Sequence, residues 1–286
     1  MPVLFTLVLA AAAPSWVGYT PEQIAPELAE IHKKEATFNG RLLAISSRFL
    51  GAPYKFSPLG EESGVDADPL FTTKEFDCLS LVEISLALAA TPNVTDALKL
   101  LKDIRYFNGE AITGPNYVER KHFMESQWIP ENTRIGWVKD VTKQVGGPLA
   151  ITVKKTMNPE IYKKRKKVQE LDLPEHRIPN GVFQWPVIPL DKMEEVGAKI
   201  PNGSLIFVVR EDYQTIPYRI THVGIIVQRK SGTYVRHAKD QGAHMVLDMP
   251  LAAVVKRHAE FVKWPVTGFS IYAPTSPKPA VAAHAM

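Results

Sequence analysis

The sequence predicts an α+β fold, and three observations lead to it. The N-terminal third has helical periodicity, the chain after Pro201 has strand periodicity, and an almost wholly apolar segment beginning at Cys78 lies between them. A helix that is apolar on nearly every side is buried in a core. We therefore expect a helix starting at Cys78 to pack on an antiparallel sheet of five or six strands.

The first helix has the clearest start signal. Thr20 provides a capping hydroxyl, Pro21 suits the first helical position, and Gln23 is placed to reach back to the cap. In the second helix, Gly51 follows an apolar face as the expected C-cap. We expect helices at residues 21–34, 39–50 and 78–90, with a short helix after Asn93.

The C-terminal part reads as an antiparallel meander. Turn signals separate its strands, and Lys230-Ser231-Gly232 is the clearest hairpin. We expect strands at residues 205–209, 222–227, 233–238, 245–247 and 269–272. The stretch of about 101–199 carries many Gly and Pro turn signals and is read as an insertion decorating the core. One catalytic domain is expected over 19–275, with its core at about 40–100 and 200–275 and a disordered Pro- and Ala-rich tail at 276–286.

Composition limits the classes of partner and compartment. The formal charge of +4 and the pI near 9.0 favour anionic partners without choosing among them. A single cysteine excludes an intrachain disulfide, and no apolar run reaches the roughly 18 residues of a membrane span, so no stable membrane insertion is expected. Apolar residues 4–9 and the alanines after them predict a signal peptide at 1–18 and export to the periplasm or cell envelope. No Lys or Arg precedes this run, and a buried first helix is the alternative.

Cys78 is the candidate nucleophile. It lies where a polar loop becomes a buried helix, and the free N–H groups and dipole of a helix N-terminus favour a thiolate. The same N–H groups suit the oxyanion of a tetrahedral intermediate. The alternative is a buried cysteine that packs as a small hydrophobe.

Two histidines are candidate partners for the cysteine. His222 starts an otherwise apolar stretch, Thr221 to Val227, and His237 lies in the next expected strand. In such an arrangement His222 accepts the thiol proton and gives it to the leaving amine, while His237 holds the tautomer of the imidazole. A histidine taken alone is more often a hydrogen-bonded structural residue than a catalytic one.

These residues fall within a series of motifs that resembles a known family. The series is similar to the NlpC-like cysteine peptidases of the papain-like fold, and the insertion and the Asp-Cys-x-Ser-x-x-Glu form ending at Glu83 resemble its N-acetylmuramoyl-L-alanine amidase-like branch. The motifs, in order, are Leu50-Gly51-Ala52-Pro53-Tyr54, Phe76-Asp77-Cys78-Leu79-Ser80, Ile200 to Phe207, His222-Val223-Gly224-Ile225 and Arg236-His237-Ala238. Leu79 and Ser204 depart from the usual small residue and aspartate.

The resemblance implies roles for individual positions. It makes Cys78 the nucleophile, His222 the base and His237 the orienting residue, and it places Tyr54 near the developing oxyanion. Asp77 and Ser80 match positions that line the substrate cleft. Within the insertion, the stretch from Tyr117 to Phe123 resembles one that this branch uses near its substrate. We therefore expect Arg120 and His122 to bind substrate, since an Arg fork suits a carboxylate, although a surface salt bridge would also explain Arg120.

The function predicted from these residues is a cysteine hydrolase acting on peptidoglycan or muropeptides. By resemblance, the scissile bond is the amide between muramic acid and L-alanine. Its rival is the bond after γ-D-glutamate, which an endopeptidase cleaves. Readings from other classes are a non-catalytic peptidoglycan-binding module and an acyltransferase acting on lipid.

Other signals have ordinary explanations. The basic run Lys163 to Lys167 fits a solvated face, and no aromatic residues interleave it, so no nucleic-acid partner is expected. Cys78, His222 and His237 suit a nucleophile and its helpers better than a zinc site. No metal or cofactor is expected, and the protein is expected to be a monomer.

Overall fold

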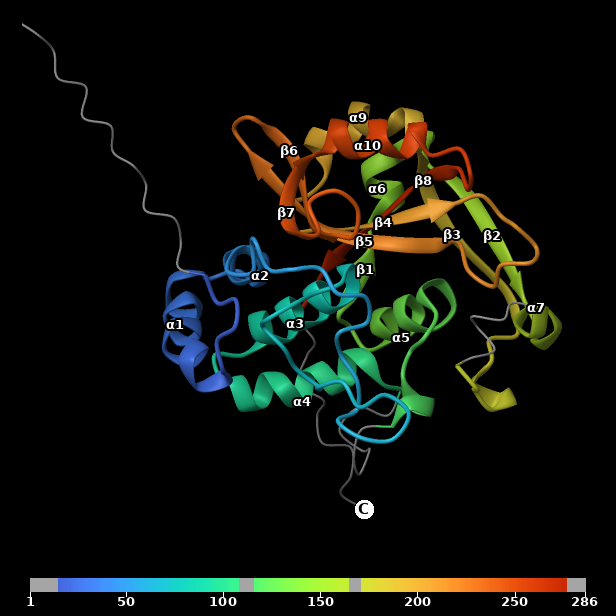
Figure 1. Ribbon diagram of the computed structural model, residues 1–286. Coiled ribbons are helices and arrows are strands. Elements are labelled where there is room, and N and C mark those ends of the chain that lie inside the picture. The colour runs from blue at the N-terminus through green and yellow to red at the C-terminus, as the bar shows by residue number, and fades with distance from the viewer. Residues whose placement is uncertain (1–14, 108–115, 165–170, 277–286) are drawn as a thin grey trace, which may run out of the picture.

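A central antiparallel sheet separates two layers of helices (Figure 1). The computed structural model describes residues 15–107, 116–164 and 171–276. Helices α1 to α5 lie below the sheet in Figure 1, and α6, α9 and α10 lie above it. The helices are α1 (Pro21–Lys34), α2 (Phe38–Ser47), α3 (Cys78–Ala90), α4 (Val94–Arg105), α5 (Ile129–Arg134), α6 (Thr142–Gly146), α7 (Pro159–Lys164), α9 (Met193–Val196) and α10 (Leu251–Glu260).

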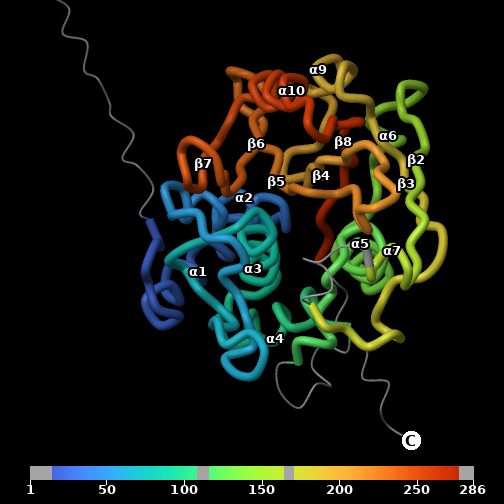
Figure 2. Tube along the Cα trace, turned by 45° about the vertical axis from the view of Figure 1, so that its right-hand side comes forward, coloured from blue at the N-terminus to red at the C-terminus, as the bar shows by residue number. Residues whose placement is uncertain are grey.

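The sheet has the strand order β2-β3-β8-β4-β5-β6-β7, and β1 also pairs with β8. All its pairings are antiparallel. Figure 2 shows β6 and β7 at one edge, near α2, and the β2–β3 hairpin at the other. The strands are β1 (Val138–Asp140), β2 (Ile151–Met157), β3 (Gly181–Pro189), β4 (Leu205–Arg210), β5 (Ile220–Arg229), β6 (Gly232–Lys239), β7 (Met245–Pro250) and β8 (Val266–Pro274).

The α+β class and the five expected C-terminal strands are confirmed. The expected sheet of five or six strands is too small, because the region read as a decorating insertion supplies β1, β2 and β3. Pro186 and Pro189 of β3 were counted as turn signals. Proline lacks the N–H that a ladder needs, but β3 pairs with β8 over only a short register, Ile188↔Phe269 and Pro189↔Gly268.

The meander is confirmed for β4 to β7, and β5 and β6 form the expected hairpin around Lys230 and Ser231. The last strand, β8, does not continue this meander. The chain passes through α10, which the sequence analysis did not predict, and β8 then pairs with β4 in the middle of the sheet. This return places α10 over the face of the sheet opposite α3, as Figure 1 shows.

The expected helices form with small changes in length. The capping box at Thr20 and Gln23 is present, and α3 has the predicted bounds. The second helix ends at Ser47, and a turn leads to Gly51, which has a φ of +85°. The helix after Asn93 continues to Arg105 and is therefore longer than expected.

Both faces of the sheet are covered by core. Leu42, Leu81 and Phe207 belong to the cluster between α1–α4 and the sheet, while Ile226 and Phe269 belong to the cluster beneath α10. Burial of such side chains contributes about 25 cal/mol per Å² of apolar surface. The sheet is therefore a rigid base on which catalytic side chains can be held.

The expected signal peptide at 1–18 lies mostly outside the described residues. Its described end belongs to the fold: Trp16 is fully buried, and its indole Nε1 donates to Glu27. A cleavage that spares this contact falls before Trp16. Ser276 is the only described residue of the expected tail. Among the helices of the described ranges, none is both long and apolar enough to cross a membrane.

Candidate active site

Cys78 is the first residue of α3 because Asp77 caps the helix. The Asp77 carboxylate accepts from the Ser80 N–H at 2.7 Å, and the Ser80 hydroxyl oxygen accepts from the Asp77 N–H at 2.9 Å. This reciprocal pair satisfies two of the free donors at a helix start. The backbone N–H groups of Cys78 and Leu79 consequently remain available and point at the thiol.

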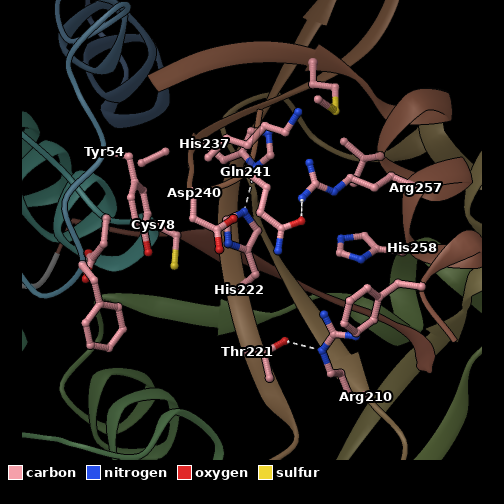
Figure 3. A pocket seen from close by; sticks show the side chains of 17 residues that line it. Tyr54, Cys78, Arg210, Thr221, His222, His237, Asp240, Gln241, Arg257 and His258 are labelled. Carbon is pink, nitrogen blue, oxygen red and sulfur yellow. Dashed lines mark hydrogen bonds between the residues drawn. The ribbon is translucent and has the colours of Figure 1, made fainter. Parts of the chain in front are cut away.

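The two histidines come from neighbouring strands and meet. His222 lies near the start of β5 and His237 near the end of β6, and His222 Nε2 is 2.7 Å from His237 Nδ1. The rings are edge to face, with centroids 4.9 Å apart. Figure 3 shows the Cys78 sulfur and the His222 ring facing the same space.

This space is a pocket of about 210 Å³. Tyr54, Asp77, Cys78, His222 and His237 all line it, so the structure brings five of the eight predicted site residues together. Tyr54 is held by its backbone, whose N–H donates to His244 O at 2.8 Å. In Figure 3 its ring lies beside Cys78 on the side away from Arg257.

The Cys78 thiol is neutral. Cys78 is half-buried, and burial together with the neighbouring Asp77 carboxylate raises its pKa to about 12, although N–H groups of Val223, Cys78 and Leu79 act in the opposite direction. The position of Cys78 at a helix N-terminus, taken alone, predicts a thiolate. Burial has the larger effect here. The free energy needed to remove the thiolate from water exceeds the stabilisation that the free N–H groups give it.

The histidines are neutral as well. Burial, followed by the charge of His237, lowers the pKa of His222 well below its ordinary value. Burial, followed by Lys239 and Arg257, lowers the pKa of His237 to about 4. Burial raises the pKa of Tyr54, and the Asp77 carboxylate adds to this shift, so the Tyr54 hydroxyl remains a donor.

The histidine pair can act as a base in one tautomer only. If His222 Nε2–H donates to His237 Nδ1, then His222 Nδ1 keeps a lone pair for the thiol proton. The reverse tautomer places a hydrogen on His222 Nδ1 and blocks that role. In the productive form, the single N–H hydrogen of neutral His237 is on Nε2, which is buried without a hydrogen-bond partner among the described residues.

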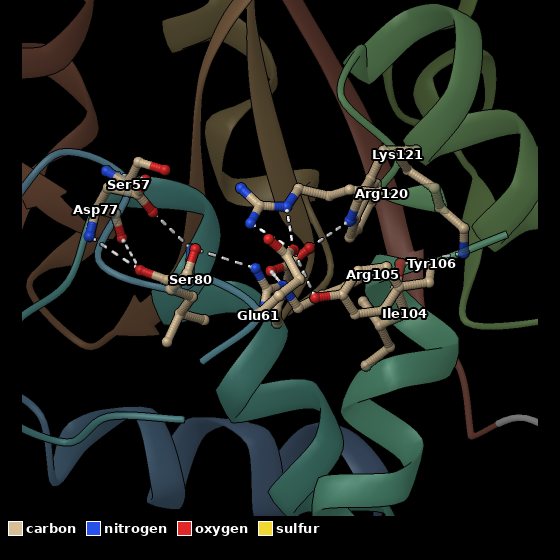
Figure 4. Close-up of polar contacts among 12 residues, drawn as sticks. Ser57, Glu61, Asp77, Ser80, Ile104, Arg105, Tyr106, Arg120 and Lys121 are labelled. Atoms are coloured by element: carbon tan, nitrogen blue, oxygen red, sulfur yellow. Dashed lines mark hydrogen bonds and ion pairs between the residues drawn. The ribbon is translucent and has the colours of Figure 1, made fainter. Parts of the chain in front are cut away.

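Three predicted site residues lie outside this pocket. Ser80 and Arg120 line a second, smaller pocket behind Asp77 (Figure 4). The Arg120 fork is engaged by the protein itself, with Glu61 at 2.5 Å and Asp66 at 2.9 Å. The His122 ring nitrogen lies 2.8 Å from Tyr117 O, and burial lowers its pKa to about 4. Substrate binding by Arg120 and His122 stays a prediction.

The residues on the far side of the main pocket are not predicted by any sequence motif. Arg210, Lys239, Arg257 and His258 line it, together with Asp240. These residues belong to the ends of β4 and β6, the segment after β6, and α10. The adjacent Lys256, Arg257 and His258 were a visible basic group, but their position depends on α10, whose packing the sequence pattern did not predict.

The fold and pocket together define an α+β protein with a cysteine and two histidines at the end of a sheet. The chain belongs to the AmiA-like family, described as N-acetylmuramoyl-L-alanine amidase-like, whose model matches residues 44–261. No curated protein matches the sequence.

Solved structures share the fold at low sequence identity. Protein LPG0564 of Legionella pneumophila superposes with a TM-score of 0.74 and 24% identity, covering 90% of this chain and 96% of that one. An N-acetylmuramoyl-L-alanine amidase of Bacteroides uniformis gives 0.64 and 21%, covering 83% and 99%. A Bacteroides fragilis protein described as a xylanase gives a TM-score of 0.61 and 24% identity, covering 80% of this chain and 99% of that one.

Proposed function

We propose that this protein is a cysteine hydrolase that cleaves the amide bond between N-acetylmuramic acid and L-alanine in peptidoglycan fragments. The observation that carries the proposal is the common pocket of Cys78 and the His222–His237 pair, whose ring nitrogens are 2.7 Å apart. Membership of the amidase-like family supports the choice of bond. The order of the motifs supports placing the chain among the NlpC-like peptidases of the papain-like fold.

The first half of the reaction forms a thioester. His222 Nδ1 takes the thiol proton as the Cys78 sulfur attacks the lactyl carbonyl carbon, and the carbonyl oxygen becomes an oxyanion. Free N–H groups at the start of α3 and the Tyr54 hydroxyl stabilise that oxyanion. The C–N bond then breaks, and His222 gives its proton to the leaving amine of L-alanine.

The second half releases the acid. Water attacks the thioester carbon while His222 accepts one of its protons. The carbon–sulfur bond breaks, and the proton returns to the sulfur, which restores the neutral pair. His237 remains a neutral acceptor for His222 Nε2–H throughout, because the imidazolium keeps that hydrogen.

The other functions receive less support from this pocket. A glycosidase of the usual kind needs two carboxylates that work as acid and as base or nucleophile. Asp77 and Asp240 are the pocket carboxylates, and Asp77 is engaged by the N–H groups of Ser80 and Ser57. A binding module does not need a cysteine and a histidine that line the same pocket, so Cys78 and His222 favour an enzyme over a binding module.

The test is a digest of defined muropeptides, with fragments identified by mass spectrometry. We expect release of the intact stem peptide from the sugar, and no release with Cys78→Ala. A product in which the sugar keeps L-alanyl-γ-D-glutamate, while the rest of the stem peptide is released, instead identifies the endopeptidase. Cleavage that persists in Cys78→Ala refutes the cysteine mechanism.

Two accompanying proposals concern the setting of the enzyme. Export to the periplasm or cell envelope rests on the apolar N-terminal run at residues 4–9. Action as a monomer is consistent with a pocket built from one chain. Fractionation of cells and sedimentation of the purified protein test them separately.

A further inference from the structure

The far side of the main pocket carries three cations that form no ion pair with another described residue. Arg210, Lys239 and Arg257 line it, and none of the three has an ion-pair partner within the described parts of the chain. Of the two pocket carboxylates, Asp77 caps α3 and Asp240 is exposed at the rim. Cations left unpaired in a pocket favour an anionic ligand.

Neutral groups hold two of these cations in place. Arg210 Nε donates to the Thr221 hydroxyl at 3.0 Å, and the guanidinium lies 4.8 Å from the Phe261 ring centroid. Arg257 Nη2 donates to the Gln241 amide oxygen at 2.8 Å. Because neutral partners do not cancel the charge, each guanidinium is positioned without being satisfied electrostatically.

The titration of neighbouring groups agrees with a positive field. Burial, followed by the charges of Arg210 and Arg257, lowers the pKa of His258 to about 4. Burial, followed by Arg257, lowers the pKa of Lys239. A bound carboxylate would offset the part of both shifts that the neighbouring arginine charges cause.

The position of the cations indicates which part of the substrate, on one side or the other of the scissile amide, lies next to them. Figure 3 shows His222 between Cys78 on one side and Arg257, His258 and Arg210 on the other. His222 protonates the leaving amine, so the part of the substrate attached to that amine continues on the side of His222 away from the sulfur. In the proposed reaction that part is the stem peptide.

We propose that Arg210 and Arg257, with Lys239 at the rim, form a subsite for a carboxylate of the leaving peptide. This inference rests on the proposed function. The first free carboxylate after the scissile amide of an L-alanyl-γ-D-glutamyl peptide is the α-carboxylate of the glutamate. The subsite therefore selects peptides that retain this carboxylate over peptides in which it is an amide.

Arg257 is the residue to vary, because Arg210 also holds Thr221 and Trp264 in place. We expect wild type to cleave the carboxylate muropeptide about tenfold better than its α-amide by kcat/KM. Arg257→Gln should remove that preference by slowing only the carboxylate substrate. Lys256→Gln is the matched control, since Lys256 is exposed on the same helix and does not line the pocket.

Equal rates for the two substrates with wild type, or an equal loss for both with Arg257→Gln, overturn the subsite while leaving the amidase proposal intact. If wild type cleaves neither substrate at the muramoyl amide, the proposed function fails, and binding still decides the inference. Calorimetry on Cys78→Ala should then give about tenfold tighter binding of L-alanyl-γ-D-glutamyl-L-lysine than of its α-amide, again lost with Arg257→Gln. Equal affinities overturn the inference.

Discussion

At the scale of single residues, the chemistry depends on where one proton resides. Burial keeps both Cys78 and His222 neutral in the free pocket. The thiol is therefore activated during the attack on the substrate, by transfer of its proton to His222, rather than by a thiolate formed in advance. This distinguishes the site from one in which a helix N-terminus holds a permanent thiolate.

The neutral thiol predicts slow alkylation. At pH 7.5 the folded protein should react with iodoacetamide at least about tenfold more slowly than free cysteine, because its pKa is raised to about 12. The rate should keep rising above pH 9. The urea-unfolded protein, labelled in parallel, should react like the free amino acid. A folded-state rate that is fast and level from pH 6 to 8 would instead show a thiolate.

The histidine pair predicts a difference between two substitutions. His237→Ala removes the acceptor of His222 Nε2–H and should lower kcat by about 100-fold with little change in KM. His237→Asn places an amide oxygen near the former Nδ1 and should restore most of that loss. If the two variants lose activity equally, with unchanged thermal unfolding, His237 does not act by orienting His222.

At the scale of elements, one buried ion pair connects the sheet to the helices. The Arg236 fork of β6 donates to both Asp248 oxygens in β7, at 2.8 and 3.0 Å, and its third nitrogen donates to Leu43 O and Ser46 of α2. The next residue along β6 is His237. Arg236 therefore positions the strand that carries the orienting histidine.

Breaking this pair should be costly. Arg236→Met leaves the buried Asp248 with only Arg229 and should lower the free energy of unfolding by about 3 kcal/mol. Arg229→Met removes the more exposed partner of the same carboxylate and should cost less than about 1 kcal/mol. Urea denaturation measures both. If both variants lose the same free energy of unfolding, the burial of Arg236 does not determine how much its ion pair contributes to stability.

At the scale of the whole molecule, buried histidines make stability depend on pH. The pKa values of His122, His237 and His258 are lowered to about 4, and that of His222 is lowered as well. Between pH 6.5 and 4 the unfolded chain therefore binds protons that the folded chain does not, and stability falls as the pH falls through this window.

Buried carboxyls offset part of this effect. Burial raises the pKa of Glu125 to about 7 and raises that of Glu83, so each binds a proton more readily in the folded state. Unfolding near pH 5 should still take up about two protons net. Urea titrations at pH 7, 6 and 5 measure this uptake as the slope of unfolding free energy against pH. Stability that is constant or rises toward pH 5 contradicts the expectation.

The local sequence pattern predicts many of the helices and strands of the fold. The capping box at Thr20, the apolar run from Cys78 to Ala90 and the alternating strands after Pro201 depend on contacts between near neighbours in the chain. The strands of the insertion did not follow, because the prolines in β3 resemble turn signals and the local sequence does not show that β3 pairs with β8 over only two residue pairs.

The sequence by itself determined the chemical groups: one thiol at a helix start and two histidines in adjacent strands. Tertiary structure decided their state and surroundings. Burial, which no local pattern reports, reversed the expected charge of Cys78. The return of the chain through α10 brought Arg257 and His258 to the pocket from far along the sequence. Charge states and pocket walls depend on which distant segments exclude water from a group, and that is fixed only when the sheet and its helices pack together.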